Sequence, residues 1–432
     1  MWTVIETLLW WLAVLLIVLG TLLAVGFYLK GAWRDRIEYR VQHAPSPDES
    51  RFPHTLASIT NSMITTGVVT GFWDEPPLIQ QARLEAISKA RHSIDFETFF
   101  MTPGRRANDF AAAIAERATA GVKIRLLIDS YGTKKIAKQY WQRLRATGVE
   151  IVFFNPFTWK APLDYAGRTH RKLLIVDGKF ALIGGAGISD LWDGTEKDDD
   201  TKPWLDIELC LEGEIIFLLE GIFFQHWTFG GGVADLERLL FPSSSAEHHL
   251  MIVTPGANPS YRFSPIKALK QNSIICARKR IWLASPYFLP DLDSCELLVA
   301  SKKDGLDVRV LTTSDRSDKK PVYYASYEHY GPLLAGGVEI YEYQPSMIHA
   351  KMLLIDDRWV ATGSTNFDPR SFFHNEELDI LTADPQLVEN IKSVFEKGFA
   401  QSVRVSLSDW QQRSLWRHRI LGNLVNFVQW QL

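Results

Sequence analysis

Cysteine is scarce in this chain, and metal-binding patterns are missing. Only three cysteines occur among 432 residues, Cys210, Cys276 and Cys295, and they are widely spaced. Their odd number and unpaired spacing argue against a disulfide framework and against a zinc site, so we expect buried, reduced thiols. The sequence also has no Asp/Glu/His cluster with the spacing of a two-metal site. We therefore predict no metal and no other cofactor.

A strong charge of either sign is also missing. The chain has 47 Lys and Arg against 50 Asp and Glu, a net charge of −3, which provides no overall attraction to nucleic acid. We therefore expect no nucleic-acid partner. The composition, 46% hydrophobic and 22% charged, is that of globular protein, and the length exceeds that of one compact domain. Two similar domains with appendages are predicted.

One long stretch lacks charge altogether. From Leu8 to Leu29 the chain is largely apolar, which is long enough to cross a bilayer, and aromatic residues flank the stretch. The alternative is a cleaved signal peptide. Against it, no Lys or Arg precedes the apolar run, the run is longer than a signal core, and no small-x-small cleavage site follows. A retained transmembrane helix is therefore predicted within residues 1–30.

Basic residues follow this helix directly, and they predict its orientation. By the positive-inside rule the large C-terminal part lies in the cytoplasm, in a protein that crosses the inner (plasma) membrane once. The basic residues are Lys30, Arg34, Arg36 and Arg40. Residues 41–56 are rich in proline and polar side chains, so residues 31–74 are predicted as a juxtamembrane linker.

The chain contains two copies of one motif, THRKLLIVDGKFALIGG and IHAKMLLIDDRWVATGS. Each reads His-x-Lys, four residues, Asp, six residues, then Gly-Gly or Gly-Ser. The apolar residues between Lys and Asp predict a buried strand that leads into a hairpin. Because alternate strand residues share a face, His170 and Lys172 project together, as do His349 and Lys351.

The segments around the motifs are also duplicated. Strand-like and helix-like segments alternate in the same order before each copy, and three pairs of landmarks repeat at offsets of 179 (349 − 170), 184 (305 − 121) and 189 (337 − 148). We predict an α/β fold of two duplicated domains, residues 75–245 and 246–405, with mixed sheets flanked by helices. A pseudo-twofold axis between them would bring both histidines into one cleft.

Two histidines can share the work of transferring a phosphoryl group. One attacks as nucleophile while the other protonates the leaving group, and the lysines neutralise the non-bridging phosphate oxygens. A nucleophilic histidine needs a carboxylate to fix its tautomer. The candidates are Asp206 and Glu377, on the strands that follow the motifs. Their respective alternates are Glu208 and Glu376.

The motif aspartates, Asp177 and Asp356, complete the candidate catalytic set. They lie beyond the strand, so pairing with a cation or capping a turn is the preferred role for each of them.

Two further segments have alternative explanations. Residues 215–229 are apolar all round, which is typical of a core helix between the halves and also compatible with a membrane-facing surface. Residues 406–432 are predicted as a basic amphipathic helix, suited to an anionic membrane surface or to docking against the body.

With GSTNFDPRS and HNEE after the second copy, the two motifs resemble the signature motifs of the phospholipase D superfamily, over roughly residues 75–400. Within it the chain is most similar to bacterial cardiolipin synthases, on THRKLLIVDGKFALIGGAGISD, the Pro203-Trp204-x-Asp206 segment, SPYFLPD and the N-terminal helix. The resemblance implies transfer of a phosphatidyl group, through a phosphohistidine, from phosphatidylglycerol or a similar phospholipid to a lipid hydroxyl. It also implies that His170 is the nucleophile and His349 the acid, with Ser364 and Asn366 near the phosphate.

One departure lies in the first copy, where Gly187 replaces the usual asparagine. Residue types alone do not separate a transferase from a hydrolytic phospholipase D that releases phosphatidic acid, because that depends on the exclusion of water. A nuclease is the less favoured alternative, since the membrane segments favour lipid substrates and a bilayer as partner. The sequence says nothing of the oligomeric state.

Overall fold

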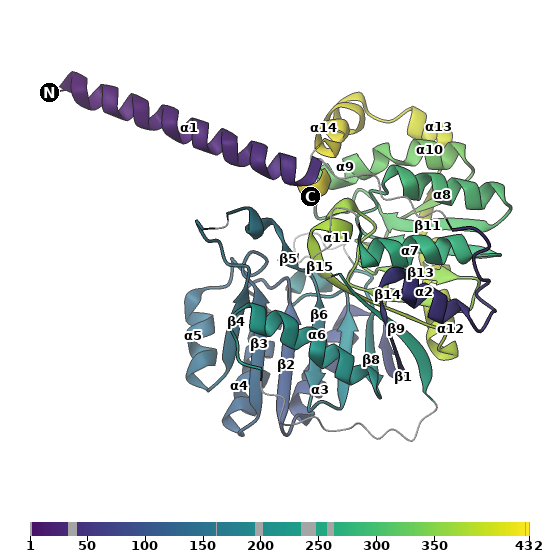
Figure 1. Ribbon diagram of the computed structural model, residues 1–432, viewed down its shortest axis with the longest axis horizontal. Coiled ribbons are helices and arrows are strands. Elements are labelled where there is room, and N and C mark those ends of the chain that lie inside the picture. Colours follow the sequence, from purple (N-terminus) through teal and green to yellow (C-terminus); the bar gives the residue numbers. More distant parts are fainter. Residues whose placement is uncertain are drawn as a thin grey trace.

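Strand β1 (Met63–Trp73) joins the two halves of the chain in the computed structural model (Figure 1). Its first part pairs antiparallel with β9 (His249–Gly256), and its second part pairs antiparallel with β8 (Glu208–Glu212). One hydrogen-bonded sheet of 16 strands therefore runs through both halves.

The structure describes residues 2–32, 41–160, 162–194, 202–234, 248–256, 263–427 and 429–431. The predicted boundary between residues 245 and 246, and the basic residues Arg34, Arg36 and Arg40, lie outside the described residues.

The first half alternates strands and helices before its motif hairpin, as predicted. Its elements in chain order are α2 (Phe52–Thr60), β1, α3 (Pro76–Lys89), β2 (Ser93–Thr98), α4 (Arg105–Thr119), β3 (Lys123–Asp129), α5 (Lys138–Ala146), β4 (Glu150–Phe154), the 3-10 helix η1 (Pro162–Ala166), β5 (Arg168–Thr169), β6 (Lys172–Val176), β7 (Phe180–Gly184), the 3-10 helix η2 (Asp190–Asp193), β8 and α6 (Ile215–Phe229).

The second half repeats this order. Its elements are β9, α7 (Pro265–Cys276), β10 (Arg280–Ser285), α8 (Leu292–Lys303), β11 (Asp307–Thr313), α9 (Lys320–Glu328), α10 (Tyr330–Ala335), β12 (Glu339–Tyr343), β13 (Met352–Ile355), β14 (Trp359–Gly363), α11 (Pro369–Phe373), β15 (Asn375–Thr382), α12 (Pro385–Ala400) and β16 (Ser402–Val405).

The strand order has an internal pseudo-twofold relation. From the centre outward, one side reads β1-β8-β7-β6-β2-β3-β4 and the other reads β9-β15-β14-β13-β10-β11-β12, with β16 added at the second edge. The outer strands β2, β3 and β4 are parallel to one another, as are β10, β11 and β12, while the motif hairpins add antiparallel strands. The prediction of two duplicated domains with mixed sheets is confirmed.

Local sequence signals explain where many of these elements begin and end. Ser264, Asp291 and Asp384 each cap a helix by accepting a hydrogen bond from the backbone N–H three residues later. At the ends of the equivalent helices α4 and α8, Gly121 and Gly305 adopt φ angles of +88° and +92°. No described residue has an atom within 4 Å of where their Cβ atoms would be, so the backbone conformation itself requires glycine.

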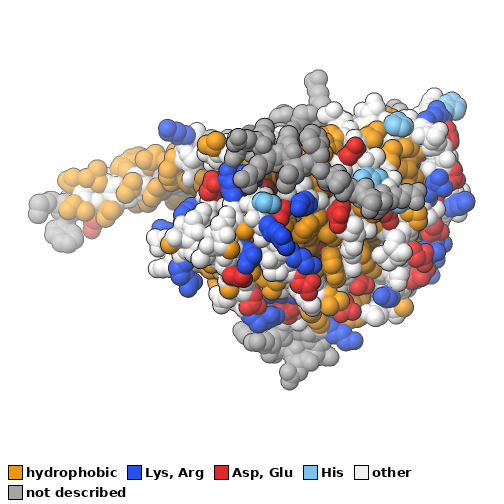
Figure 2. Space-filling view, turned by 90° about the horizontal axis from the view of Figure 1, so that it is seen from below, with side chains coloured by type: hydrophobic (Ala, Val, Ile, Leu, Met, Phe, Trp, Pro, Cys, Tyr) orange, Lys and Arg blue, Asp and Glu red, His pale blue; other side chains and the backbone are white. Residues whose placement is uncertain are grey.

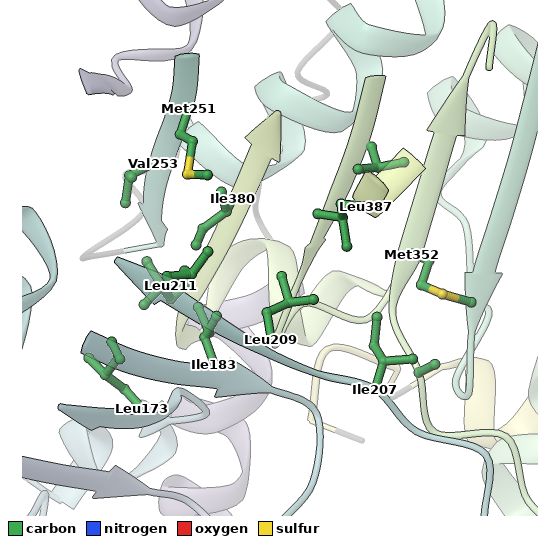
Figure 3. Close-up of a cluster of buried hydrophobic side chains, with 14 of the residues drawn as sticks. Leu173, Ile183, Ile207, Leu209, Leu211, Met251, Val253, Met352, Ile380 and Leu387 are labelled. Carbon is green, nitrogen blue, oxygen red and sulfur yellow. The ribbon is translucent and has the colours of Figure 1, made fainter. Parts of the chain in front are cut away.

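A hydrophobic cluster fills the space between the halves (Figure 3). It combines first-half strands β6, β7 and β8 with second-half elements β9, β13, β15 and α12. The labelled residues are Leu173, Ile183, Ile207, Leu209, Leu211, Met251, Val253, Met352, Ile380 and Leu387. Because the cluster draws on both halves, their packing fixes the relation between the two motifs.

Helix α6 is a core helix, which settles the first of the two open alternatives. It contacts strands of both halves, β1 and β6 to β9. Its large apolar side chains, including Ile215, Phe223 and Trp227, are buried. The membrane-facing alternative for residues 215–229 is wrong.

Helix α1 (Trp2–Ala32) projects from the body (Figure 1). Among the described residues it is the helix that is long and apolar enough to span a membrane, over Val4–Gly26, and none of this span is buried. Hydrophobic side chains cover its visible surface (Figure 2). The predicted N-terminal apolar helix is present.

The predicted linker over residues 31–74 is wrong from residue 52 onward. Helix α2 packs on α7, and β1 is the first-half counterpart of β9, so the repeat begins at Met63. The sequence MITTGVVTGFW mixes threonine and glycine with apolar residues because most of its side chains are only partly buried. Backbone pairing on both sides, which composition does not report, makes it a strand.

The predicted continuous helix over residues 406–432 is also wrong. The segment forms α13 (Leu407–Gln411), the π-helix η3 (Leu415–Gly422), α14 (Asn423–Asn426) and the 3-10 helix η4 (Gln429–Gln431). Ser406 and Ser414 each accept a backbone hydrogen bond that starts a new helical piece. The Trp410 indole donates to the Tyr327 carbonyl at 2.8 Å, so contacts with α9 interrupt the helical path.

Candidate active site

The two motifs form equivalent hairpins, β6–β7 and β13–β14. The histidines lie just before these hairpins rather than within them, because β6 begins at Lys172 and β13 begins at Met352. Each lysine folds back on its histidine: Lys172 Nζ donates to the His170 carbonyl and Lys351 Nζ to the His349 carbonyl, both at 2.5 Å. Histidine and lysine therefore share one site, as the spacing predicts.

Each histidine is held by a carboxylate of the other half. His170 Nδ1 lies 3.0 Å from Glu377 Oε2, and His349 Nδ1 lies 2.8 Å from Asp206 Oδ2. Both predicted carboxylates are therefore in the site, but each pairs with the histidine of the opposite repeat. Neither half alone contains a complete histidine–carboxylate pair.

Backbone pairing across the halves produces this exchange. Strand β5 pairs in parallel with β15, and the His170 N–H donates to the Glu376 carbonyl at 2.8 Å. On the opposite side Leu205 bridges Ile348, and the His349 N–H donates to the Leu205 carbonyl at 2.6 Å. The residue next to each of these carbonyls is the carboxylate that holds the histidine.

The hydrogen bonds of His170 define its tautomer. Its Nδ1 lies 3.0 Å from two acceptors, the Glu377 carboxylate and the Ser364 carbonyl, so Nδ1 carries the proton. Nε2 then has a free lone pair, and within the described residues it makes no hydrogen bond. This is the nitrogen that a nucleophilic histidine presents.

His349 differs because a lysine covers it. Its Nδ1 donates to Asp206, while Lys351 Nζ lies 2.9 Å from Nδ1 and 3.1 Å from Nε2. The ring is enclosed by Trp192 at 5.1 Å and Trp204 at 5.9 Å between centroids. This enclosure suits a proton donor whose position must be fixed. Nε2 of His170 is therefore the more open ring nitrogen of the two histidines.

A third group supports each carboxylate, and it differs between the halves. The Ser364 hydroxyl donates to Glu377 Oε2 at 2.5 Å, whereas the Trp192 indole donates to Asp206 Oδ2 at 2.9 Å. The position equivalent to Ser364 is Gly185, where a Cβ atom would collide with Asp206 Oδ1. The first copy thus uses Trp192, which lies outside the motif, in place of the motif serine.

The alternates Glu208 and Glu376 have other partners. Glu208 pairs with Arg83 at 2.6 Å, and Arg83 also donates to the carbonyls of Ala186 and Gly187. Glu376 lies 3.4 Å from His226. Glu208 and Arg83 hold the loop after Gly-Gly, and the second half repeats the pair as Asp379 and Lys270 at 2.8 Å.

Asp177 and Asp356 do not belong to the site, which corrects their place in the candidate set. Both adopt a φ of +54° in the hairpin turn and accept backbone hydrogen bonds, Asp177 from residues 91–93 and Asp356 from residues 278–280. A strand about 16 Å long separates them from the lysines. They tie the hairpin turn to the start of the neighbouring strand, β2 or β10, by accepting from backbone amides. Of the two predicted roles, the contacts are therefore with turn and strand backbone and not with a cation.

Burial dominates the electrostatics of the site. It lowers the pKa of His170 to about 4 against the opposing effect of Glu377, and burial together with Lys351 lowers the pKa of His349 to about 3. Both imidazoles are therefore neutral in the unliganded site. Although burial opposes it, His349 holds the pKa of Asp206 at about 2.

The lysines also titrate unusually. Burial and the neighbouring Lys351 lower the pKa of Lys172 to about 7, and burial lowers the pKa of Lys351 to about 8. The two ammonium groups repel each other until an anion arrives between them. The site is therefore prepared to bind a negatively charged group and to take up protons as it does so.

A bound anion must accordingly be held more weakly at higher pH. Both lysine pKa values are lowered, so the charges are complete below about pH 7 and are lost as the pH rises through 7 and 8. Sulfate, which does not titrate in this range, should lose at least about tenfold in affinity between about pH 6 and about pH 9. Calorimetry in buffers of different ionisation enthalpy would measure both the affinity and the proton uptake.

Lys172→Arg provides the control, because a guanidinium keeps its charge throughout this range. The decrease in affinity should become shallower in that variant. Sulfate affinity that is constant, or that increases with pH, would contradict the assignment of the two lysines.

Ser364 and Asn366 both lie in the buried loop after β14. Asn366 is 4% exposed, and its Oδ1 atom accepts no hydrogen bond from the part of the chain that the structure describes. At the equivalent position, a Cβ atom on Gly187 would lie 2.7 Å from the Phe100 carbonyl oxygen and 3.2 Å from the Trp192 ring. The first copy therefore has no room for the usual asparagine, because the Phe100 carbonyl and the Trp192 ring occupy the space.

Restoring asparagine at this position should harm the protein. We expect Gly187→Asn to lower the free energy of unfolding by about 1–3 kcal/mol, because Phe100 and Trp192 must move. Thermal unfolding in detergent would measure it. Gly221→Ala is the matched control, since its Cβ position on α6 has no atom of the described ranges within 4 Å and alanine favours the helix. A Gly187→Asn variant as stable as the unmodified protein would show that the space is not filled.

One buried cluster beside His170 is not predictable from the motifs. The His226 imidazole lies 2.7 Å from Glu97 and 3.2 Å from Arg171, and Glu97 also bonds Thr169. Arg171 donates to the Glu377 carbonyl at 3.1 Å. The cluster thus connects α6 to Thr169 and Arg171, the residues on either side of His170, and through Arg171 to the backbone of Glu377.

This cluster belongs to the first copy alone. Arg171 corresponds to Ala350 in the second motif, and Glu97 occupies the strand position of Ala284. The signal available in the sequence was the difference between HRK and HAK, together with a lone histidine in the apolar helix 215–229. This sequence difference lies beside His170, the histidine whose Nε2 makes no hydrogen bond with the described residues.

The comparisons with known proteins agree with this geometry. A family model described as "Cardiolipin synthase, PLD-like domain" matches residues 84–192 and 271–398, one segment in each half. The chain is 32% identical over 340 residues to cardiolipin synthase 2 of Bacillus anthracis, covering 78% of this chain and 66% of that protein. It is also 32% identical over 341 residues to a cardiolipin synthase of Geobacillus thermodenitrificans, with 77% and 66% covered. The chain thus spans about two thirds of the length of these relatives.

Solved structures share the fold. A phosphatidylserine synthase of Haemophilus influenzae superposes with a TM-score of 0.68 at 13% identity, covering 88% of this chain and 99% of that one. A polyphosphate kinase of Porphyromonas gingivalis superposes with a TM-score of 0.51 at 11% identity, covering 90% of this chain and 57% of that one. At these identities the likeness concerns the architecture of two facing repeats.

Proposed function

Because this chain belongs to the cardiolipin synthase family of phospholipase D-like proteins, we propose that it is a membrane-bound phosphatidyltransferase. It would move a phosphatidyl group from one phospholipid, phosphatidylglycerol or a similar lipid, to the hydroxyl of a second. The observation that carries the proposal is the pairing of each histidine with a carboxylate of the other half. This pairing places two oriented histidines and two lysines in one buried site.

In the first step His170 Nε2 attacks the phosphorus of the donor lipid. A P–N bond forms, and the bond from phosphorus to the headgroup oxygen breaks. The neutral state of His170 supports this role, since its pKa of about 4 leaves the Nε2 lone pair available at neutral pH. The phosphohistidine that results is an intermediate of our proposal.

His349 gives the proton that the leaving oxygen needs. Its pKa of about 3 in the unliganded site is too low for an acid, because burial and Lys351 both oppose a second charge. A bound phosphodiester adds a negative charge beside the ring and raises that pKa. The imidazole therefore takes up its proton as the substrate binds, and Asp206 stabilises the cation.

The second step reverses the first with a new alcohol. The hydroxyl of the acceptor lipid attacks phosphorus, its proton passes to the neutral His349, and the P–N bond breaks. Lys172 and Lys351 neutralise the non-bridging oxygens in both steps, with Ser364 and Asn366 near the phosphate. Water in place of the lipid alcohol would give phosphatidic acid.

The low exposure of the histidines supports transfer over hydrolysis. His170 is 8% exposed and His349 is 7% exposed, so little bulk water reaches the intermediate.

The arrangement in the membrane is part of the proposal. Helix α1 would span the inner membrane once, with both repeats on the cytoplasmic side, because Lys30 and the basic residues up to Arg40 follow the helix in the sequence. Digestion of the repeats by protease added outside sealed, right-side-out vesicles would overturn this orientation.

Mass spectrometry of the products tests the activity. The detergent-solubilised chain is incubated with phosphatidylglycerol, and we expect cardiolipin and glycerol. Phosphatidic acid without cardiolipin would contradict a transferase and leave a hydrolase. A single-stranded oligonucleotide serves as the competing phosphodiester, and its cleavage at a rate above that of the lipid would contradict the lipid substrate.

A further inference from the structure

The base of helix α1 lies beside the active site. The helix contacts both η1 and η4, which belong to opposite halves of the chain (Figure 1). The last residue of η1, Ala166, accepts a hydrogen bond from Arg370 of α11 at 3.1 Å, and its chain continues through β5 to His170. Helix α11 also contacts η4, and its chain continues into β15, which carries Glu377. Two short segments thus lead from α1 to the His170–Glu377 pair.

On the first-half side of this junction, a loop exposes large aromatic side chains. Trp159 is 81% exposed and Phe157 is 48% exposed, and their rings lie 4.9 Å apart in a T-shaped pair. Phe157 also contacts Tyr165 of η1 at 5.6 Å. Lys160 follows directly in the sequence. The aromatic side chains therefore remain exposed although they are ordered against η1.

On the second-half side, the C-terminal segment exposes a similar set. Trp416, Leu424 and Phe427 are 74%, 65% and 62% exposed, and Arg417 and Arg419 lie between them in the sequence. The segment is nevertheless firmly attached. An ion pair of 2.6 Å joins Arg413 to Glu328 of α9, and Asn426 donates to the Ala325 carbonyl at 3.2 Å.

Exposed tryptophan, phenylalanine and leucine with interspersed basic residues are typical of segments that lie in a membrane interface. A second copy of the chain could also cover such a surface. The bilayer is favoured because each surface is joined to a segment that contacts the membrane helix: Phe157 packs on Tyr165 of η1, and residues 415–427 lead directly toward η4. The basic side chains also complement anionic lipid. We call the first surface the loop anchor (residues 157–160) and the second the C-terminal anchor (residues 415–427).

We propose that the loop anchor and the C-terminal anchor insert into the interface of the bilayer that α1 spans, one on each side of the helix. The end of the sheet at which His170 and Glu377 lie then faces anionic phospholipid directly. A lipid headgroup reaches the site from the membrane plane without its acyl chains passing through water. This inference rests on the proposed function for its substrate, but the contact with the bilayer can be measured without any turnover.

Depth-dependent quenching tests the contact. The full chain is reconstituted in vesicles of phosphatidylcholine and phosphatidylglycerol, with an environment-sensitive fluorophore on Trp159→Cys or Leu424→Cys. Thr119→Cys is the matched control, because Thr119 is exposed at the end of α4, near the start of β3. The opposite end of β3 carries Asp129, which accepts a hydrogen bond from the Thr169 N–H beside His170. The unsubstituted chain, treated with the same label, gives the background from Cys210, Cys276 and Cys295.

We expect spin-labelled lipids to quench the labels at positions 159 and 424 and to leave the label at 119 unquenched. An absence of quenching at 159 and 424, or equal quenching at all three positions, would overturn the proposal. Quenching in a chain that makes no lipid product would keep the proposal and reject the proposed function, so the two failures are distinguishable.

A kinetic comparison tests the consequence for substrate delivery. We expect Trp159→Ser combined with Leu424→Asn to raise the KM for phosphatidylglycerol in vesicles by about tenfold. Turnover of a short-chain, monomeric phosphatidylglycerol should be unchanged, since that substrate reaches the site from water. An equal loss with both substrates would indicate damage to the fold and would overturn this part of the proposal.

Discussion

Turnover of phospholipid should fall by at least about 10⁴-fold when His170 is replaced by alanine, because the variant lacks the nitrogen that forms the P–N bond. The site offers no ready substitute. Lys351 Nζ already contacts both ring nitrogens of His349, and the rings of Trp192 and Trp204 enclose that histidine. The covalent phosphatidyl-enzyme should disappear together with turnover.

Rapid-quench experiments with labelled lipid would measure both turnover and the acid-sensitive covalent intermediate. His349→Ala is the informative partner, because a missing proton donor slows departure of the headgroup by about 10²–10⁴-fold but leaves the nucleophile in place. With a lipid whose leaving group needs no proton, His349→Ala should still accumulate the intermediate. An intermediate trapped in His170→Ala would exchange the roles of the two histidines.

Replacing Glu377 by glutamine should lower turnover by about 10³–10⁴-fold, although nearly the same shape is kept. Glu377 Oε2 accepts from both His170 Nδ1 and the Ser364 hydroxyl, and an amide nitrogen at that position would face two donors. The imidazole would then rotate or change its tautomer, and the Nε2 lone pair would no longer point toward phosphorus. The first-order rate of formation of the intermediate in a single turnover reports this loss directly.

Glu376→Gln provides the control, since it is the neighbouring glutamate that the sequence offered as an alternate. Its carboxylate lies 3.4 Å from His226 and 3.7 Å from Arg171, outside the direct contact with the reacting histidine. We expect a loss below about tenfold there. If the two variants lost equal activity, the orientation of His170 would depend on the whole buried cluster rather than on one carboxylate.

The sequence allowed the repeats and most of their elements to be predicted because those signals are local. Apolar runs, helix caps and turn glycines lie within a few residues of the structure that they specify, and Gly121 and Gly305 illustrate this with nearly equal φ angles. The histidines, the lysines and both carboxylates could be selected for the same reason. The histidines and lysines lie at the start of the apolar strand of each motif, and the carboxylates lie just before or within the next strand of the chain.

The exchange of carboxylates could not be predicted in this way. His170 and Glu377 are 207 residues apart in the chain, and only the pairing of β5 with β15 brings them together. Strand β1 was missed for a related reason, since its partly exposed side chains give no clear alternation and its position depends on two distant partners. Trp192 was missed because nothing in its local sequence indicates that its indole replaces a motif serine.

The exchanged carboxylates also bear on how such a chain could have arisen. A polypeptide with a single repeat could build this site only as a symmetric homodimer, in which each subunit lends its carboxylate to the histidine of the other. Joining two repeats in one chain removes the requirement that both sides be identical. The differences between Ser364 and Gly185, and between Ala350 and Arg171, are what that freedom permits: one ancestral half-site can specialise in attack and the other in proton transfer.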